Sequence, residues 1–121
     1  MLACEDQGVS RITIRRAVPE DLAAILAMYA ELADPSEDGP AAGETAAKLL
    51  REVIADSDRH LTAALLDGKP AGTADLLLVA NLTHHGSPWA ILENVVVAAS
   101  ARRAGVGTKL MSHLIELARE A

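Results

Sequence analysis

The most constraining feature of this 121-residue chain is a strand-to-helix segment at residues 92–108. It reads Leu-Glu-Asn-Val-Val-Val-Ala-Ala-Ser-Ala-Arg-Arg-Ala-Gly-Val-Gly-Thr. Branched residues favour a strand at 89–97, and a helix follows from about Gly105, with Leu110, Leu114 and Leu117 as its apolar stripe. The segment therefore predicts a buried strand, a short connection and an amphipathic helix.

The start of that helix predicts an anion-binding site. The first backbone N–H groups of a helix have no partner within it, and the helix dipole adds partial positive charge there. Gly105 and Gly107 lack a Cβ, so a large anion can approach these amides closely. Arg102 and Arg103 add cations, and the Thr108 hydroxyl can donate a hydrogen bond. We predict a pyrophosphate site here; the alternative interpretation is a tight turn with two solvated arginines.

Two common nucleotide-binding patterns do not fit. The dinucleotide fingerprint G-x-G-x-x-G needs a third glycine where this sequence has Leu110, and an acidic residue about 20 positions further on, which the sequence does not reach. The P-loop pattern G-x-x-x-x-G-K-[ST] is absent from the sequence.

The rest of the chain predicts a single α/β (α+β) domain with a mixed sheet at 11–121, after a flexible leader at 1–10. The continuously apolar run Leu76–Val79 predicts a strand covered on both faces. Five further elements precede the strand at 89–97 and the helix from about Gly105. They are a strand at 11–15, helices at 19–33 and 45–56, and an antiparallel hairpin of strands 60–67 and 71–81. The predicted order is therefore β-α-α-β-β-β-α.

The composition indicates which binding partners and which cell compartment to expect for this protein. A net charge of −6 argues against binding to nucleic acid or anionic membranes and favours a basic ligand such as an amine. The single cysteine, Cys4, forms neither an internal disulfide nor a metal cluster, and no metal site is predicted. No run of 18 apolar residues occurs, and Glu5 and Asp6 interrupt the leader, so a cytoplasmic protein is expected.

The motif Arg102-x-x-Gly105-x-Gly107 resembles the Q/R-x-x-G-x-G/A signature of the GNAT superfamily, the Gcn5-related N-acetyltransferases. Residues 93–97 resemble the strand that precedes this signature, and the opening segment 12–32 resembles the start of a GNAT domain. The likeness therefore extends from Ile12 to Ala121, and the Arg/Gly motif is its most specific part.

The resemblance implies acetyl-CoA as co-substrate and transfer of its acetyl group to a small-molecule or peptide amine. It implies that the pantetheine arm pairs with the backbone of the preceding strand, and that the pyrophosphate rests on the loop amides. The coenzyme residues would be Val95, Val96, Val97, Arg102, Arg103, Ala104, Gly105, Val106, Gly107 and Thr108.

Candidates for chemistry follow from what amine acetylation needs: removal of a proton from the amine and polarisation of the thioester carbonyl. Glu93 is the candidate general base, with an exposed strand-end acid as the alternative interpretation. By resemblance, the amide of Val95 or of a neighbouring residue is the candidate oxyanion donor, and Tyr29 and Glu31 are candidate acceptor contacts. Tyr29 also fits the core. His84-His85 is interpreted as a solvated loop, and the acidic loop 34–38 as solvated or amine-attracting.

Three functions remain open from the sequence. The chain is an acetyltransferase, a non-catalytic acetyl-CoA-binding module, or a subunit that associates, as a homo-oligomer or with a partner, through an exposed sheet edge. In GNAT domains a strand, a helix and two more strands normally follow the last helix seen here. We therefore expect the 121 residues to lack that C-terminal portion, including the usual general acid, and to turn over slowly alone.

Overall fold

The computed structural model describes residues 11–33 and 39–121. The predicted leader at 1–10 and the acidic loop at 34–38 lie outside the described residues. The predicted order β-α-α-β-β-β-α is confirmed. The strands are β1 (Ile12–Arg16), β2 (Arg59–Leu66), β3 (Lys69–Val79) and β4 (Trp89–Val97); the helices are α2 (Leu22–Leu32), α3 (Gly43–Ala55) and α4 (Val106–Glu120); short 3₁₀ turns are η1 (Pro19–Asp21), η2 (His84–Gly86) and η3 (Ala99–Ala101).

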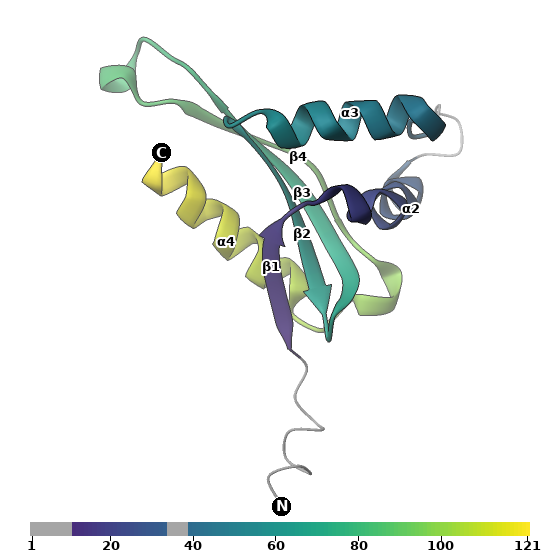
Figure 1. The fold of residues 1–121 in the computed structure, drawn as a ribbon. Helices are drawn as coiled ribbons and strands as arrows, with labels where there is room; N and C mark the ends of the chain where they lie inside the picture. Colours follow the sequence, from purple (N-terminus) through teal and green to yellow (C-terminus); the bar gives the residue numbers. More distant parts are fainter. Residues whose placement is uncertain (1–10, 34–38) are drawn as a thin grey trace, which may run out of the picture.

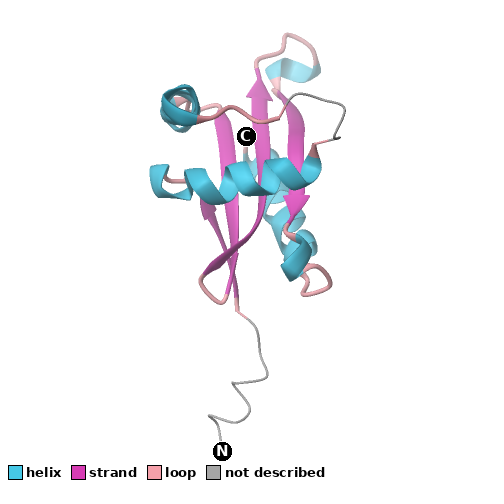
Figure 2. Ribbon diagram, turned by 90° about the vertical axis from the view of Figure 1, so that its right-hand side faces the viewer, coloured by secondary structure: helices cyan, strands magenta, loops and turns pink. Residues whose placement is uncertain are grey.

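The four strands form one sheet in the order β1-β2-β3-β4, and all three described pairs are antiparallel. A parallel pair, which a mixed sheet would contain, is not among them. Seen face-on, the strands run side by side with a helix crossing in front of them (Figure 2). The turn at 67–68 between β2 and β3 uses left-handed backbone at both residues, which suits an antiparallel hairpin.

Helices cover both faces of the sheet (Figure 1). Helix α4 packs on one face, where Val106, Leu110 and Leu114 are buried against small residues of β2 and β3 such as Ala64 and Ala74. Helices α2 and α3 cover the opposite face around clusters that include Ile25, Leu50, Leu61, Met28 and Val96. No described helix has the length and apolar character needed to span a membrane.

The apolar run at the end of β3 differs from the prediction. Leu76 is buried, but Leu77, Leu78 and Val79 are only half-buried. The reason is geometric: Val79 pairs with Trp89, which is 57% exposed, so this end of the β3–β4 hairpin extends beyond the cover of the helices. The prediction of a strand covered on both faces was therefore wrong for its last three residues.

Candidate functional site

The connection between β4 and α4 takes an unusual backbone path. After η3, Arg103 has a φ of 71° and Gly105 a φ of 87°, both in the left-handed region. Glycine adopts this region freely, whereas an arginine there is strained. Gly105 is the cap residue of α4, and its carbonyl oxygen accepts a hydrogen bond from the Lys109 N–H at 3.1 Å.

The backbone amides at the start of α4 have no side-chain cap among the described residues. The N–H groups of Val106, Gly107 and Thr108 precede the first residue that can bond within the helix. They border an open pocket of about 260 Å³ that the loop also lines. The lining residues are Val97, Ala101, Arg102, Arg103, Gly105, Val106, Gly107 and Thr108. The predicted residues from Arg102 to Thr108 thus surround one pocket, except Ala104, which is exposed in the same loop.

The two arginines are arranged differently. The Arg102 Nε donates a hydrogen bond to the Val97 carbonyl oxygen at 3.4 Å, which ties its side chain to the end of β4. Both arginines are exposed at the pocket, so their guanidinium groups place positive charge beside the free amides. A Cβ on Gly107 would meet only Val97 Cγ2 at 3.5 Å, an ordinary contact, so packing alone does not require glycine there.

Gly72 of β3 sets how closely α4 approaches the sheet. A Cβ at this position would lie 3.2 Å from Val106 Cγ1 and 3.2 Å from the Val96 carbonyl oxygen. Val106 itself is 1% exposed. Gly72 therefore lets the first residue of α4 sit against the sheet and fixes the helix start beside the end of β4.

Strand β4 carries a bulge at Asn94. Thr73 pairs with Val96 and Asp75 with Glu93, so two residues of β4, Asn94 and Val95, stand opposite one residue of β3. Asn94 has a φ of 52°, which asparagine tolerates better than most residues. Among the described strands β4 pairs only with β3, so backbone groups on its other edge are free to pair with an extended ligand.

Glu93 lies on the face of the sheet covered by α2 and α3. It is register-paired with Asp75, and opposed residues of an antiparallel pair share a face. Asp75 is 2% exposed, and both its carboxylate oxygens accept hydrogen bonds from the Arg59 Nε, at 3.0 and 3.1 Å. Its Oδ2 also accepts a hydrogen bond from the Arg59 Nη2 at 2.5 Å. Glu93 itself is exposed, so a proton accepted there can reach water.

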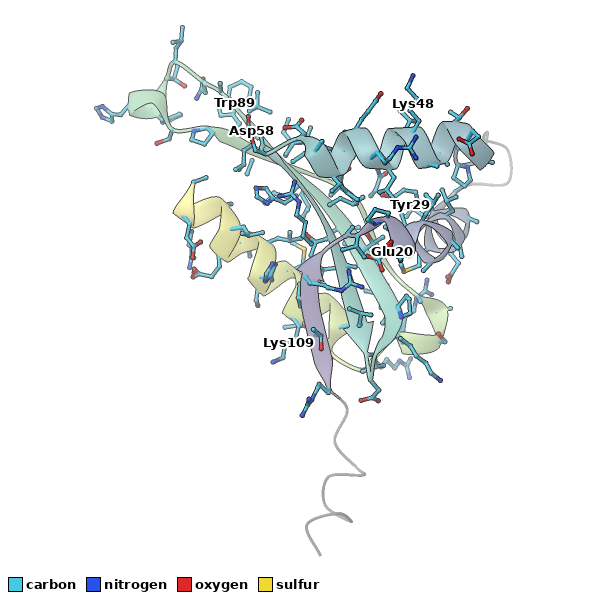
Figure 3. The ribbon with its side chains drawn as sticks, in the orientation of Figure 1. Glu20, Tyr29, Lys48, Asp58, Trp89 and Lys109 are labelled. Atoms are coloured by element: carbon cyan, nitrogen blue, oxygen red, sulfur yellow. The ribbon has the colours of Figure 1, made fainter. Side chains whose placement is uncertain are left out.

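Tyr29 and Glu31, the predicted acceptor contacts, separate in the structure. Tyr29 is half-buried between α2 and α3 (Figure 3), where burial and then the charge of Asp75 raise the pKa of its hydroxyl. Glu31 instead accepts a hydrogen bond from the Ala99 N–H at 3.0 Å. Tyr29 thus lines a pocket, whereas Glu31 holds the connection that follows β4.

The histidine pair lies far from the loop that contains Arg102 and Arg103. His84 and His85 are exposed in η2, which precedes β4, whereas the Arg/Gly loop (residues 102–108) follows it. A strand of nine residues separates them, a length of about 30 Å. The histidines are therefore at the opposite end of β4 from the Arg/Gly loop.

Sequence reasoning missed three residues that shape these sites: Arg59, Gly72 and Asp75. Asp75 carried a signal, because a lone carboxylate inside an apolar strand must find a partner when it is buried. Gly72 carried a weaker one, since a glycine within a strand often marks a close approach of another element. The identity of the partner, Arg59, has no signal in the sequence.

Known proteins share this fold. The sequence matches the acetyltransferase (GNAT) family over residues 23–121. A solved structure of a candidate acetyltransferase from Agrobacterium tumefaciens str. C58 is 34% identical, with a TM-score of 0.79 over 89% of this chain and 74% of that one. A transcriptional regulator from Bacillus halodurans C-125 is 27% identical, with a TM-score of 0.79 over 91% and 75%.

A more distant structure shares the fold alone. Glucosamine-6-phosphate N-acetyltransferase from Arabidopsis thaliana is 18% identical, with a TM-score of 0.78 over 91% of this chain and 76% of that one. Among curated proteins, none matched the sequence.

Proposed function

Because the chain belongs to the acetyltransferase (GNAT) family, we propose that it transfers the acetyl group of acetyl-CoA to a primary amine. One observation carries the proposal: uncapped amides at the start of α4 open onto a pocket flanked by Arg102 and Arg103. Fixed amides and guanidinium groups together suit a pyrophosphate.

The coenzyme would extend from this pocket along β4. Its pyrophosphate lies on the amides of residues 105–108, and its pantetheine arm pairs with the free edge formed by residues 95–97. Main-chain pairing recognises an extended amide-containing chain without needing particular side chains. The bulge at Asn94 interrupts the ladder where the thioester would arrive, and the Val95 amide is the proposed hydrogen-bond donor there.

In the transfer step, the neutral amine nitrogen attacks the acetyl carbonyl carbon. The bond between this carbon and the coenzyme sulfur then breaks. Glu93 accepts the proton that the nitrogen loses, directly or through a water molecule. The Val95 N–H donates to the carbonyl oxygen as negative charge develops on it. The coenzyme leaves as a thiolate and takes up a proton from solvent.

The test uses a charge placed at the pocket. Thr108→Glu puts a carboxylate beside the proposed pyrophosphate, and an acid in the first helical turn does not destabilise the helix. Ser112→Glu adds the same charge one turn further along α4, also at an exposed position. We expect Thr108→Glu to weaken CoA binding about tenfold or more by calorimetry, and Ser112→Glu to change it by less than about threefold.

Binding is measured before turnover, because the solved structures contain residues beyond the part that this chain covers. Equal binding by wild type and Thr108→Glu would refute the pyrophosphate site. Release of free thiol from acetyl-CoA with a panel of amines then separates an enzyme from a module that only binds the coenzyme. Glu93→Gln should abolish the amine-dependent part of that release.

Association of two copies through the free edge of β4 is a second candidate role. It is favoured by three exposed apolar residues on this edge strand, Trp89, Ile91 and Val95, which are 57%, 39% and 38% exposed. Sedimentation equilibrium of the chain and of Ile91→Lys tests it. A dimer that Ile91→Lys dissociates supports the association, and a wild-type monomer contradicts it.

A further inference from the structure

A second pocket lies between α2, α3 and the sheet, on the face opposite α4. Its volume is about 190 Å³. Its walls are mostly aliphatic side chains of the two helices, and its floor is formed by the strand residues, which are Leu61 and three polar residues. The residues used below are Ile25, Tyr29, Leu49, Arg59, Asp75 and Asn94.

The floor of this pocket adjoins the proposed reaction centre. Asn94 lines the pocket and is the bulged residue of β4, directly between Glu93 and Val95. Glu93 pairs with Asp75, so the proposed base projects from the same face of the sheet as the pocket. A ligand held in the pocket therefore has a short route to the site where the thioester would lie.

The electrostatics of the pocket favour an uncharged ligand body. Of the described lining residues, only Arg59 and Asp75 are charged, and they neutralise one another in an ion pair. Among the residues that the structure describes around this pocket, neither a polycation nor a phosphorylated sugar finds a net countercharge. Desolvation in such a pocket disfavours an ammonium and favours the neutral amine, which is the form that attacks a thioester.

The volume limits the size of that body. A dry cavity of about 150 Å³ holds one benzene molecule, so about 190 Å³ holds a single ring or a short branched alkyl group. Because the pocket is open to solvent on one side, a molecule built of several sugar rings would leave most of its rings outside it. The volume of the pocket and the charges of its described residues therefore both favour a ligand with a small apolar body.

We propose that this pocket is the acceptor site and that it takes a primary amine on a compact apolar body, such as an arylalkylamine or a branched alkylamine. The inference rests on the proposed acetyl transfer for its chemistry. The apolar body lies between α2 and α3, and its amine points toward Asn94 and Glu93. Tyr29, with its half-buried ring, supplies part of the wall.

The chain offers a matched pair of leucines for the test. Leu49 lines the pocket and is 47% exposed; Leu32, on α2, is 49% exposed and is not among the described lining residues. Leu49→Gln removes apolar contact from the pocket without adding charge. Leu32→Gln makes the same chemical change elsewhere, at a position whose exposure differs little.

The experiment titrates 2-phenylethylamine, glucosamine 6-phosphate and an aminoglycoside into the free chain and into the chain saturated with CoA. We expect 2-phenylethylamine to bind most tightly, Leu49→Gln to weaken it about fivefold to tenfold, and Leu32→Gln to leave it within about twofold. Tighter binding of either polar amine, or equal effects of the two variants, overturns the inference.

The two proposals fail separately. CoA binding without any binding of 2-phenylethylamine overturns the acceptor pocket and leaves the proposed acetyl transfer intact. Leu49-dependent binding of 2-phenylethylamine without CoA binding supports the pocket as an amine site and overturns the proposed transfer.

Discussion

The Glu31 carboxylate accepts a hydrogen bond from the Ala99 N–H at 3.0 Å and so joins the last turn of α2 to the connection that follows β4. The residues are 68 positions apart. Ala99 begins η3, which has no cap from the side chain of Ala98, so the carboxylate satisfies an otherwise free amide. Beside it, Met28 and Val96 pack together in a small cluster.

This contact predicts that Glu31 positions the loop that we propose to bind the coenzyme. Glu31→Ala should weaken CoA binding about threefold to fivefold, because the freed connection must be ordered when the coenzyme binds. Glu31→Gln keeps an acceptor oxygen and should recover most of the affinity. Calorimetry with CoA measures both variants, and urea unfolding checks that stability changes by less than about 1 kcal/mol. Equal affinities for Ala and Gln variants would exclude a positioning role.

Arg103 should show a separation between stability and binding. Its φ of 71° is strained for an arginine, and an alanine at this position keeps that strain. We therefore expect Arg103→Gly to be more stable than Arg103→Ala by about 1 kcal/mol in urea unfolding. Both variants lack the cation, so both should bind CoA more weakly than wild type and to a similar degree. Equal stability of the two variants would contradict the predicted backbone strain.

The Arg59–Asp75 pair should respond unequally to loss of either partner. Arg59→Met leaves the Asp75 carboxylate, 2% exposed, buried without a partner, which should lower the free energy of unfolding by about 3–5 kcal/mol. Asp75→Asn should lower it less, because the Arg59 side chain is 33% exposed and its charge reaches water. Urea unfolding of both variants tests the asymmetry. Losses of equal size would show that the carboxylate is better solvated than the structure indicates.

The lowered pKa of His60 predicts that the free energy of unfolding declines in mild acid. Burial, followed by the charge of Arg16, lowers the pKa of His60 below 6.5, while Asp58 opposes this and His113 adds to it. The unfolded chain then binds the proton more readily than the folded one, so stability is full above pH 6.5 and falls as the pH drops through the lowered pKa. His60→Gln should flatten the stability curve in this range. A curve parallel to wild type would be the contrary result.

Local patterns in the sequence determined the element order and the strand-to-helix segment. The Arg/Gly loop could be identified because its residues, 102–108, are contiguous, and helix geometry alone exposes the first amides of α4. Strand alternation, the connection at 68–70 and the helical stripes are equally local, so most elements were found within about two residues of their bounds. The exception is the helix predicted at 19–33, whose first three residues form the 3₁₀ turn η1, so that α2 begins only at Leu22.

Tertiary structure alone decided the rest. Pairing of Asp75 with Arg59, capping of η3 by Glu31 and the close approach of α4 over Gly72 each join elements that are separate in the chain. The pocket between α2, α3 and the sheet is likewise assembled from several elements. Its walls have the same apolar periodicity as ordinary core, so the sequence does not mark them. The physical reason is that propensity and periodicity act over a few residues, whereas strand register and helix docking determine which distant side chains meet.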